Sequence, residues 1–213
     1  QLDKWTAKMV PDIFYHSITH EVLKHYIPIY NIKNNFRIIY RGRNENKFLG
    51  VKSKEKKFIL INAGRQEFAK GQIDILKALE YLRSEYSIND IEFQLLGRPG
   101  HYTKQLNDFI ELNSLESQVQ ILGFVKNVEE RLVQAQVFVF PSYYEGLGGA
   151  LIEAFAAKLP CACSNIPVLK EVVGSKDGAL FCKPGDYKTL GENIRKLYMV
   201  FRSSYTFSEL LCI

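Results

Sequence analysis

Short apolar runs alternate with amphipathic stretches along residues 58–200. The apolar positions within each run are mostly consecutive, which is typical of parallel strands covered on both faces. We expect six such strands, at Phe58–Ile61, Ile91–Leu96, Val119–Leu122, Val137–Phe140, Cys161–Ser164 and Leu180–Cys182. Glycine, proline or polar residues follow each run and mark its end.

Between these runs, apolar residues recur every three or four positions, as on one face of a helix. The stripes predict helices at Gly71–Ser84, Lys104–Asn113, Asn127–Val133, Gly148 or Gly149 to Ala157, Val168–Val173 and Tyr187–Val200. Asn127 is followed three residues later by Glu130, which predicts a capping box at that helix start. The alternation of strands and helices predicts an α/β fold with a Rossmann-like, doubly wound parallel sheet.

Residues 1–57 show a different pattern. They hold one amphipathic segment, Ser17–Ile27, and one strand-like run, Phe36–Tyr40, before a basic stretch. We interpret them as a piece that connects the α/β domain to another part. The expected division is residues 1–57 as connecting segment, 58–200 as the α/β domain and 201–213 as a C-terminal tail.

The chain has 213 residues, of which 46% are hydrophobic and 24% charged, as in ordinary globular proteins. The net charge of +5 lies within residues 41–57, where seven basic residues stand against two acidic ones. A charge this local is not the basic coat of a nucleic-acid-binding protein, so we expect no nucleic acid partner. Two interpretations stay open for the stretch, a solvated linker or a contact with an anionic membrane or acidic acceptor.

No stretch of the sequence is expected to cross a bilayer. The longest charge-free run, Leu132–Tyr144, is too short and contains Pro141. The four cysteines lack a zinc spacing, and His16 and His20 lack a third ligand, so we expect free thiols and no metal. The expected location is the cytoplasm, with peripheral attachment to the inner face of the membrane as the alternative. The chain begins at Gln1, so we expect a partial or processed product.

Glycines and charged residues follow three of the predicted strands. Asn62–Arg65 follows the first strand, with Lys70 at the next helix start, while Gly97–Gly100 follows the second and Pro141–Gly149 the fourth. In a doubly wound sheet, ligands bind outside the carboxyl ends of the strands. We therefore expect these three loops to line one binding site.

The residue types in these loops suit a phosphorylated sugar. Glycine lets the backbone approach a ligand, and N–H groups at the start of the helix through Glu153 form an anion site. Arg65 and Lys70 add positive charge for a phosphate or diphosphate. Glu145 and Glu153 form an E-x7-E pair, whose carboxylates can accept hydrogen bonds from sugar hydroxyls. The alternative is that Glu145 is a turn residue and Glu153 a surface helix residue.

Three segments resemble one known family in order and spacing. They are Phe138–Gly185, which begins FVFPSYYEGLGGALIEAF, Asn62–Leu82, NAGRQEFAKGQIDILKALEYL, and Ile38–Asn44, IIYRGRN. Together they resemble the C-terminal, donor-binding half of retaining glycosyltransferases of the GT-B fold, family 4. The resemblance spans roughly residues 10–200. It implies that residues 1–57 are the tail of an N-terminal domain with the interdomain linker.

The resemblance implies a role for each matching residue. Arg65 and Lys70 would hold the donor diphosphate, Glu145 would contact the donor sugar, and these three would form the catalytic set. Glu153 would bind the ribose hydroxyls. The other donor contacts implied are Gly64, Gly97, Arg98, Phe124, Val125, Gly146, Leu147, Gly148 and Gly149, with the nucleobase near Gly97–Arg98 and Phe124–Val125. Leu147 stands where the family often has an aromatic residue, and Gly149 is smaller than usual.

The resemblance also implies an activity. Such enzymes transfer a sugar from a nucleotide donor, here a UDP-, GDP- or ADP-sugar, with retention at the anomeric carbon and without another cofactor. The acceptor, a glycan or lipid-linked molecule of polysaccharide or glycoconjugate biosynthesis, would bind through an N-terminal domain absent from this chain. We therefore expect little turnover by this chain alone. The alternatives are a GT-B sugar-nucleotide epimerase and a non-catalytic donor-binding subunit.

Overall fold

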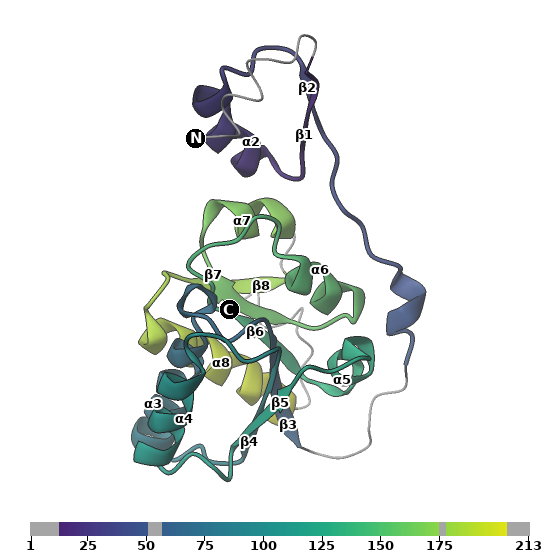
Figure 1. Ribbon diagram of the computed structural model, residues 1–213. Helices are drawn as coiled ribbons and strands as arrows, with labels where there is room; N and C mark the ends of the chain where they lie inside the picture. Colours follow the sequence, from purple (N-terminus) through teal and green to yellow (C-terminus); the bar gives the residue numbers. More distant parts are fainter. Residues whose placement is uncertain (1–12, 51–56, 175–177, 204–213) are drawn as a thin grey trace.

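The computed structural model describes residues 13–50, 57–174 and 178–203, which form two parts joined by an extended connection (Figure 1). The larger part, from residue 57 onward, is a sheet covered by helices. The smaller part lies beyond α7 (Pro167–Val173), at the top of Figure 1. Most of the predicted C-terminal tail, 201–213, lies outside the described residues.

The sheet of the larger part has six parallel strands in the order β5-β4-β3-β6-β7-β8. They are β3 (Phe58–Ala63), β4 (Ile91–Leu96), β5 (Val119–Gly123), β6 (Val137–Phe140), β7 (Cys161–Ser164) and β8 (Ala179–Cys182). The chain moves outward from β3 to β5, then returns to place β6 beside β3. This confirms the predicted Rossmann-like, doubly wound sheet, whose strand order reverses between β3 and β6.

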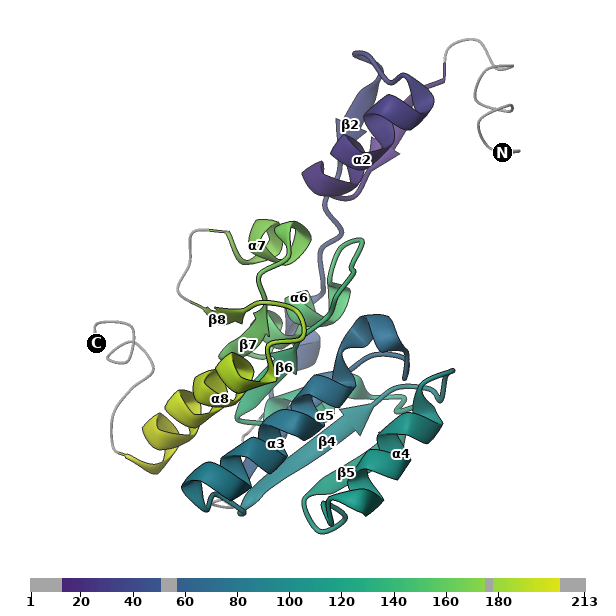
Figure 2. The same cartoon turned by 90° about the vertical axis from the view of Figure 1, so that its left-hand side faces the viewer.

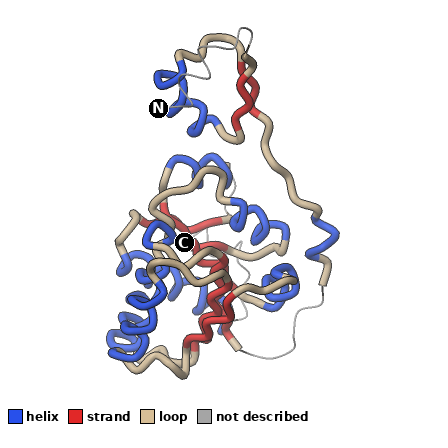
Figure 3. Tube along the Cα trace, in the orientation of Figure 1, coloured by secondary structure: helices blue, strands red, loops and turns tan. Residues whose placement is uncertain are grey.

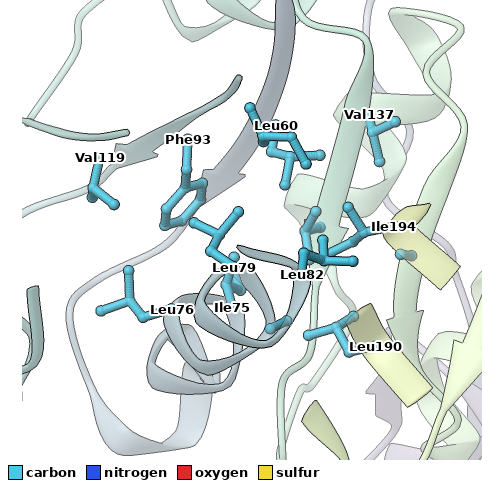
Figure 4. Packing of buried hydrophobic residues seen from close by; sticks show 14 of the residues in the cluster. Leu60, Ile75, Leu76, Leu79, Leu82, Phe93, Val119, Val137, Leu190 and Ile194 are labelled. Atoms are coloured by element: carbon cyan, nitrogen blue, oxygen red, sulfur yellow. The ribbon is translucent and has the colours of Figure 1, made fainter. Parts of the chain in front are cut away.

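Helices cover both faces of this sheet (Figures 2 and 3). One face carries α3 (Gln72–Tyr86), α4 (Thr103–Leu112) and α8 (Tyr187–Arg202), and the other carries α5 (Val128–Gln134), α6 (Gly149–Ala156) and α7. Neighbouring strand residues enter opposite cores. Leu60 packs in the first core, shown in Figure 4, whereas Ile61 packs in the second. Both faces are buried, which explains the consecutive apolar residues of β3 and β6.

The start of α5 differs from the prediction. Asn127 precedes this helix, but its side chain makes no capping hydrogen bond to the helix backbone. Its Nδ2 instead donates to Glu130 Oε1 at 2.8 Å. The predicted capping box is therefore wrong, because the two side chains bond to each other rather than to backbone N–H groups.

The smaller part is a strand–helix–strand unit with two parallel strands. Its elements are β1 (Tyr15–Ser17), α2 (His20–Tyr30) and β2 (Phe36–Ile38). The amphipathic segment Ser17–Ile27 overlaps α2, and the strand-like run Phe36–Tyr40 contains β2. The strand β1 was not expected, because Tyr-His-Ser contains no apolar run. Among the described residues of this unit, the buried apolar side chains are Leu23 and Ile32, whereas Phe14 and Tyr26 are exposed.

No helix in the described ranges is long and apolar enough to cross a bilayer.

Candidate functional site

The loops after β3 and β4 lie against each other at the carboxyl edge of the sheet. The Gly64 N–H donates to the Leu96 carbonyl at 2.8 Å, and the Gln66 N–H donates to the Arg98 carbonyl at 3.1 Å. Gly97 has φ +139°, and a Cβ there would lie 2.0 Å from the Gly64 oxygen, so only glycine fits. These contacts bring Gly64–Arg65 and Gly97–Arg98 together, as the sequence predicted.

The loops after β3 and β6 meet where the strand order reverses. Gly71 has φ +64°, and a Cβ there would lie 2.1 Å from the Pro141 oxygen. The Tyr143 N–H donates to the Ala69 carbonyl at 2.8 Å. This backbone contact fixes the short 3₁₀ turn that ends at Lys70 against the loop that carries Glu145.

Lys70 and Glu145 form an ion pair across these two loops. Lys70 Nζ lies 2.7 Å from Glu145 Oε1, which also accepts a hydrogen bond from Ser142 Oγ at 2.9 Å. The Glu145 side chain is 9% exposed and that of Lys70 27% exposed. The two residues that the sequence assigned to one site are therefore in contact, and the carboxylate is held between a cation and a hydroxyl.

Tyr143 anchors the same loop to the body of the domain. Its hydroxyl donates to Asp74 Oδ2 on α3 at 2.9 Å, and its ring packs on that of Phe68 with centroids 4.9 Å apart. Burial and the neighbouring Asp74 carboxylate raise the pKa of Tyr143 to about 12. Burial also raises the pKa of Asp74 above its ordinary value. Tyr143 therefore positions the loop, whereas Tyr144 beside it is exposed.

The helix α6 begins directly after this loop. Gly148 precedes the helix with φ +71°, and a Cβ there would lie 2.7 Å from Leu169 Cδ2. The Leu147 side chain is buried, so this residue can offer a ligand its backbone but not its side chain. The N-terminus of α6, at Gly149, has the N–H groups and the dipole that favour an anion.

Glu153 lies on α6 and pairs with a residue that the sequence did not single out. Arg43 Nε donates to Glu153 Oε1 at 2.7 Å. A cavity of about 300 Å³ opens beside this pair. Its lining consists of Gly42, Arg43, Asn44, Lys47, Phe48, Val128, Glu129 and Glu153. The sequence placed Glu153 in a site but did not predict its pairing with Arg43, which is 110 positions away.

The residues assigned to a nucleobase differ in their surroundings. The Arg98 guanidinium lies over the Phe124 ring at 4.8 Å from its centroid, and Phe124 is 65% exposed. Val125 instead packs partly against the second core. Phe124 and Arg98 thus offer an accessible stacking surface, whereas Val125 contributes mainly to packing. The Arg65 side chain is exposed at the same edge.

The smaller part touches this edge of the domain through α7 and the Glu145 loop. Glu171 on α7 accepts hydrogen bonds from the backbone N–H groups of His20 (2.7 Å) and Glu21 (3.1 Å) and from the Tyr40 hydroxyl (2.9 Å). Burial opposes ionisation, but these hydrogen bonds hold the pKa of Glu171 below its ordinary value. Thr19 Oγ1 donates to the Gly146 carbonyl at 3.3 Å. Glu171 thus caps α2, a contact that the sequence did not predict.

The described residues contain no group of three or more His, Cys, Asp or Glu side chains that could hold a metal ion. His20 Nδ1 lies 3.0 Å from Glu171, and His16 Nε2 lies 3.4 Å from the Ile39 carbonyl oxygen. The thiols of Cys161, Cys163 and Cys182 are buried, and burial raises the pKa of each. A buried thiol with a raised pKa is a poor nucleophile.

Known proteins share both the sequence pattern and the fold. Residues 43–199 match the family model of glycosyl transferases group 1. The chain is 30% identical over 154 residues to the capsular polysaccharide biosynthesis glycosyltransferase CapH of Staphylococcus aureus, an alignment covering 72% of this chain and 38% of CapH. It is 33% identical over 102 residues to O-antigen chain mannosyltransferase B of Escherichia coli, covering 47% of this chain and 26% of that protein.

Solved structures agree at the level of the fold. A glycosyltransferase from Rickettsia africae superposes with a TM-score of 0.83 at 17% identity, covering 96% of this chain and 58% of that one. Anabaena Alr3699/HepE, in complex with UDP and glucose, superposes with a TM-score of 0.77 at 17% identity, covering 90% of this chain and 54% of that one.

The fold and the matched model define the class of domain, a glycosyl transferases group 1 domain with a fold of the GT-B type. The chain belongs to the glycosyl transferases group 1 family. It spans 38% of the length of CapH and 58% of the Rickettsia africae structure, so it corresponds to part of these longer proteins.

Proposed function

We propose that this chain binds a nucleotide-diphosphate sugar at the carboxyl edge of its sheet and is the donor-binding half of a retaining glycosyltransferase. The observation that carries the proposal is the Lys70–Glu145 pair, held where the strand order reverses and directly before the N-terminus of α6. The structure of Alr3699/HepE, whose fold this chain shares, holds UDP and glucose. UDP-, GDP- and ADP-sugars are the candidate donors.

In this proposal, the diphosphate binds at the start of α6 with Arg65 and Lys70 as its cations. The exposed Arg65 side chain is free to turn toward a ligand, and Lys70 already neutralises Glu145. Glu145 would accept hydrogen bonds from the sugar, and Glu153 would accept them from the ribose. Phe124 and Arg98 would supply a stacking surface for the nucleobase.

The chemistry assigned to the whole enzyme is sugar transfer with retention. The bond between the anomeric carbon and the diphosphate breaks, and the diphosphate leaves with the electron pair. The acceptor hydroxyl oxygen then bonds to that carbon on the same face, and its proton passes to the departing diphosphate. Cations and N–H groups fixed around the leaving group lower the barrier, because negative charge develops there.

The acceptor side of the proposal rests on the smaller part of the chain. A two-stranded parallel sheet with few buried apolar residues is not a complete domain. We therefore assign β1, α2 and β2 to the end of an acceptor-binding domain supplied outside this chain. The relatives named for capsular polysaccharide and O-antigen chains favour a glycan or lipid-linked acceptor. Peripheral contact of the basic stretch with a membrane stays a prediction.

The proposal is tested by thermal unfolding of the full chain with UDP, GDP, ADP and their sugar conjugates. A nucleotide at about 100 times its dissociation constant should raise the free energy of unfolding by about 2.7 kcal/mol. The shift should disappear in Arg65→Ala and Glu153→Ala. Lys104→Ala, which removes an exposed cation on α4, should keep it. The absence of a shift with every nucleotide would contradict the proposal.

A further inference from the structure

The connection between the two parts of the chain is fixed against the α/β domain on the side of α5 and α6. Its 3₁₀ turn η1 (Glu45–Phe48) is capped by Asn44, whose Oδ1 accepts a hydrogen bond from the Asn46 N–H at 3.1 Å. Phe48 packs against the second core. A Cβ on Gly50 would lie 2.7 Å from Val133 Cγ1, so the backbone approaches α5 closely. This packing holds Arg43, the residue directly before Asn44, at one place on the domain surface.

The Arg43 guanidinium fills a space that a larger residue 149 would occupy. Its Nε donates to Glu153 at 2.7 Å and its Nη1 to the Gly42 carbonyl at 3.2 Å. A Cβ added to Gly149 would lie 2.5 Å from Arg43 Nη2. The glycine at the first position of α6 therefore makes room for the arginine of the connection.

The charges near the N-terminus of α6 explain how an arginine beside Glu153 would favour the binding of an anion. An unpaired Glu153 carboxylate, one turn inside α6, would repel an anion arriving at the helix N-terminus. The helix dipole disfavours a cation at a helix N-terminus, so it is the Glu153 carboxylate that stabilises the Arg43 guanidinium there, and not the helix. In the ion pair, Arg43 neutralises the negative charge of Glu153 near the N-terminus of α6. Arg43 Nη2 lies beside Gly149, the first residue of that helix.

We propose that Arg43 is a determinant of donor affinity. It neutralises Glu153, so that an anionic diphosphate can bind at the start of α6 while the carboxylate still accepts hydrogen bonds from the ribose. Arg43 and Lys47 also line the 300 Å³ cavity beside the pair, a volume at the lower end of the range of ligand pockets. This inference rests on the proposed function and adds that the connection, and not the α/β domain alone, completes the donor site.

The test is calorimetric titration of the full chain with UDP, GDP and ADP, using whichever binds the wild type. Arg43→Ala should weaken binding about tenfold, or about 1.4 kcal/mol. Arg43→Ala combined with Glu153→Gln should bind more tightly than Arg43→Ala alone, because glutamine removes the uncompensated charge and keeps an oxygen acceptor. Such rescue by a second substitution would not follow from a merely structural role of Arg43.

Two further variants sharpen the result. Gly149→Ala should weaken binding in the wild type by displacing the guanidinium, and should weaken it by a smaller factor in the Arg43→Ala background. Arg41→Ala removes the same charge from the same connection, two residues from Arg43, and should bind within about twofold of the wild type. Unchanged thermal unfolding of Arg43→Ala in the absence of nucleotide would show that the loss concerns binding and not folding.

The outcomes separate the two proposals. If the wild type binds a nucleotide and Arg43→Ala binds it equally well, the role of Arg43 is overturned and the proposed function stands. If Glu153→Gln fails to restore any affinity to Arg43→Ala, charge neutralisation is overturned. If the wild type binds none of the three nucleotides, the proposed function fails, and the role of Arg43 fails with it.

Discussion

The two parts of this chain differ in how they are stabilised. The α/β domain has two closed cores, one on each face of a six-stranded sheet, and its loops are fixed by backbone contacts such as that of Gly71 with Pro141. The strand–helix–strand unit buries Leu23 and Ile32 but leaves Phe14 exposed. It is attached through polar contacts, chiefly those of Glu171. We infer that the domain supplies its own stability, whereas the unit depends on its attachment.

The largest effect should come from the core of the α/β domain. Phe93 is fully buried between the sheet and α3, so Phe93→Ala should lower the free energy of unfolding by about 3–5 kcal/mol. Urea denaturation followed by circular dichroism measures this loss. Leu23→Ala is the matched change in the smaller unit and should shift the main transition by less than about 1 kcal/mol. Equal losses for both substitutions would show that the two parts unfold together.

An intermediate effect should follow from cutting the attachment at Glu171. Glu171→Ala removes an acceptor for two backbone N–H groups at the start of α2 and should destabilise that helix by about 1–2 kcal/mol. Hydrogen exchange should accelerate at the amides of α2 and stay unchanged in β3 and β6. Lys170→Ala, the neighbouring position on α7, is the control. Unchanged exchange in α2 would contradict the role of Glu171 as its cap.

The stabilisation of α2 by Glu171 should weaken as the pH falls. The pKa of Glu171 is below its ordinary value of 4.5 in the folded chain, so its stabilisation is complete above that value. The stabilisation should be lost as the pH falls through the lowered pKa. Exchange of the α2 amides should therefore respond less to acid in Glu171→Gln than in the wild type, after correction for the intrinsic pH dependence of exchange. An identical response in both would exclude Glu171 as the titrating group.

A smaller effect is expected at the loop that carries Glu145. Tyr143→Phe keeps the ring on Phe68 but removes the hydrogen bond to Asp74, which should lower the free energy of unfolding by about 0.5–1.5 kcal/mol. Urea denaturation of the variant at neutral pH gives this value. Tyr144→Phe, on the exposed neighbour, should change stability by less than about 0.5 kcal/mol. A loss in Tyr144→Phe as large as in Tyr143→Phe would contradict the anchoring role of Tyr143.

The sequence predicted most of the α/β domain because its strands are covered on both faces. Short runs rich in apolar residues marked β4, β6 and β7 with the bounds that the structure has. The strand β1 could not be found in this way, because it lies in a unit with little core and its three residues have no apolar pattern. The capping box at Asn127 failed for a different reason, since a pattern of residue types does not decide which of two local hydrogen bonds forms.

In the candidate site, too, the sequence predicted some contacts and missed others. Residues that directly follow strands, such as Lys70 and Glu145, were expected at one edge because parallel strands end there together, and the structure joins them in an ion pair. The sequence did not predict the partners of Arg43 and Glu171. Each acts across more than 100 positions between the α/β domain and the segment before it, where neither periodicity nor strand order predicts contacts.

The most direct test of the account is hydrogen exchange of the full chain with and without UDP-, GDP- or ADP-sugars. One of these donors should protect the backbone amides of residues 64–71 and 145–153, while exchange in β1 and β2 stays unchanged. Protection of both loops by the same nucleotide is the result that the proposed donor site predicts. Protection confined to other segments, or none with any donor, would contradict it.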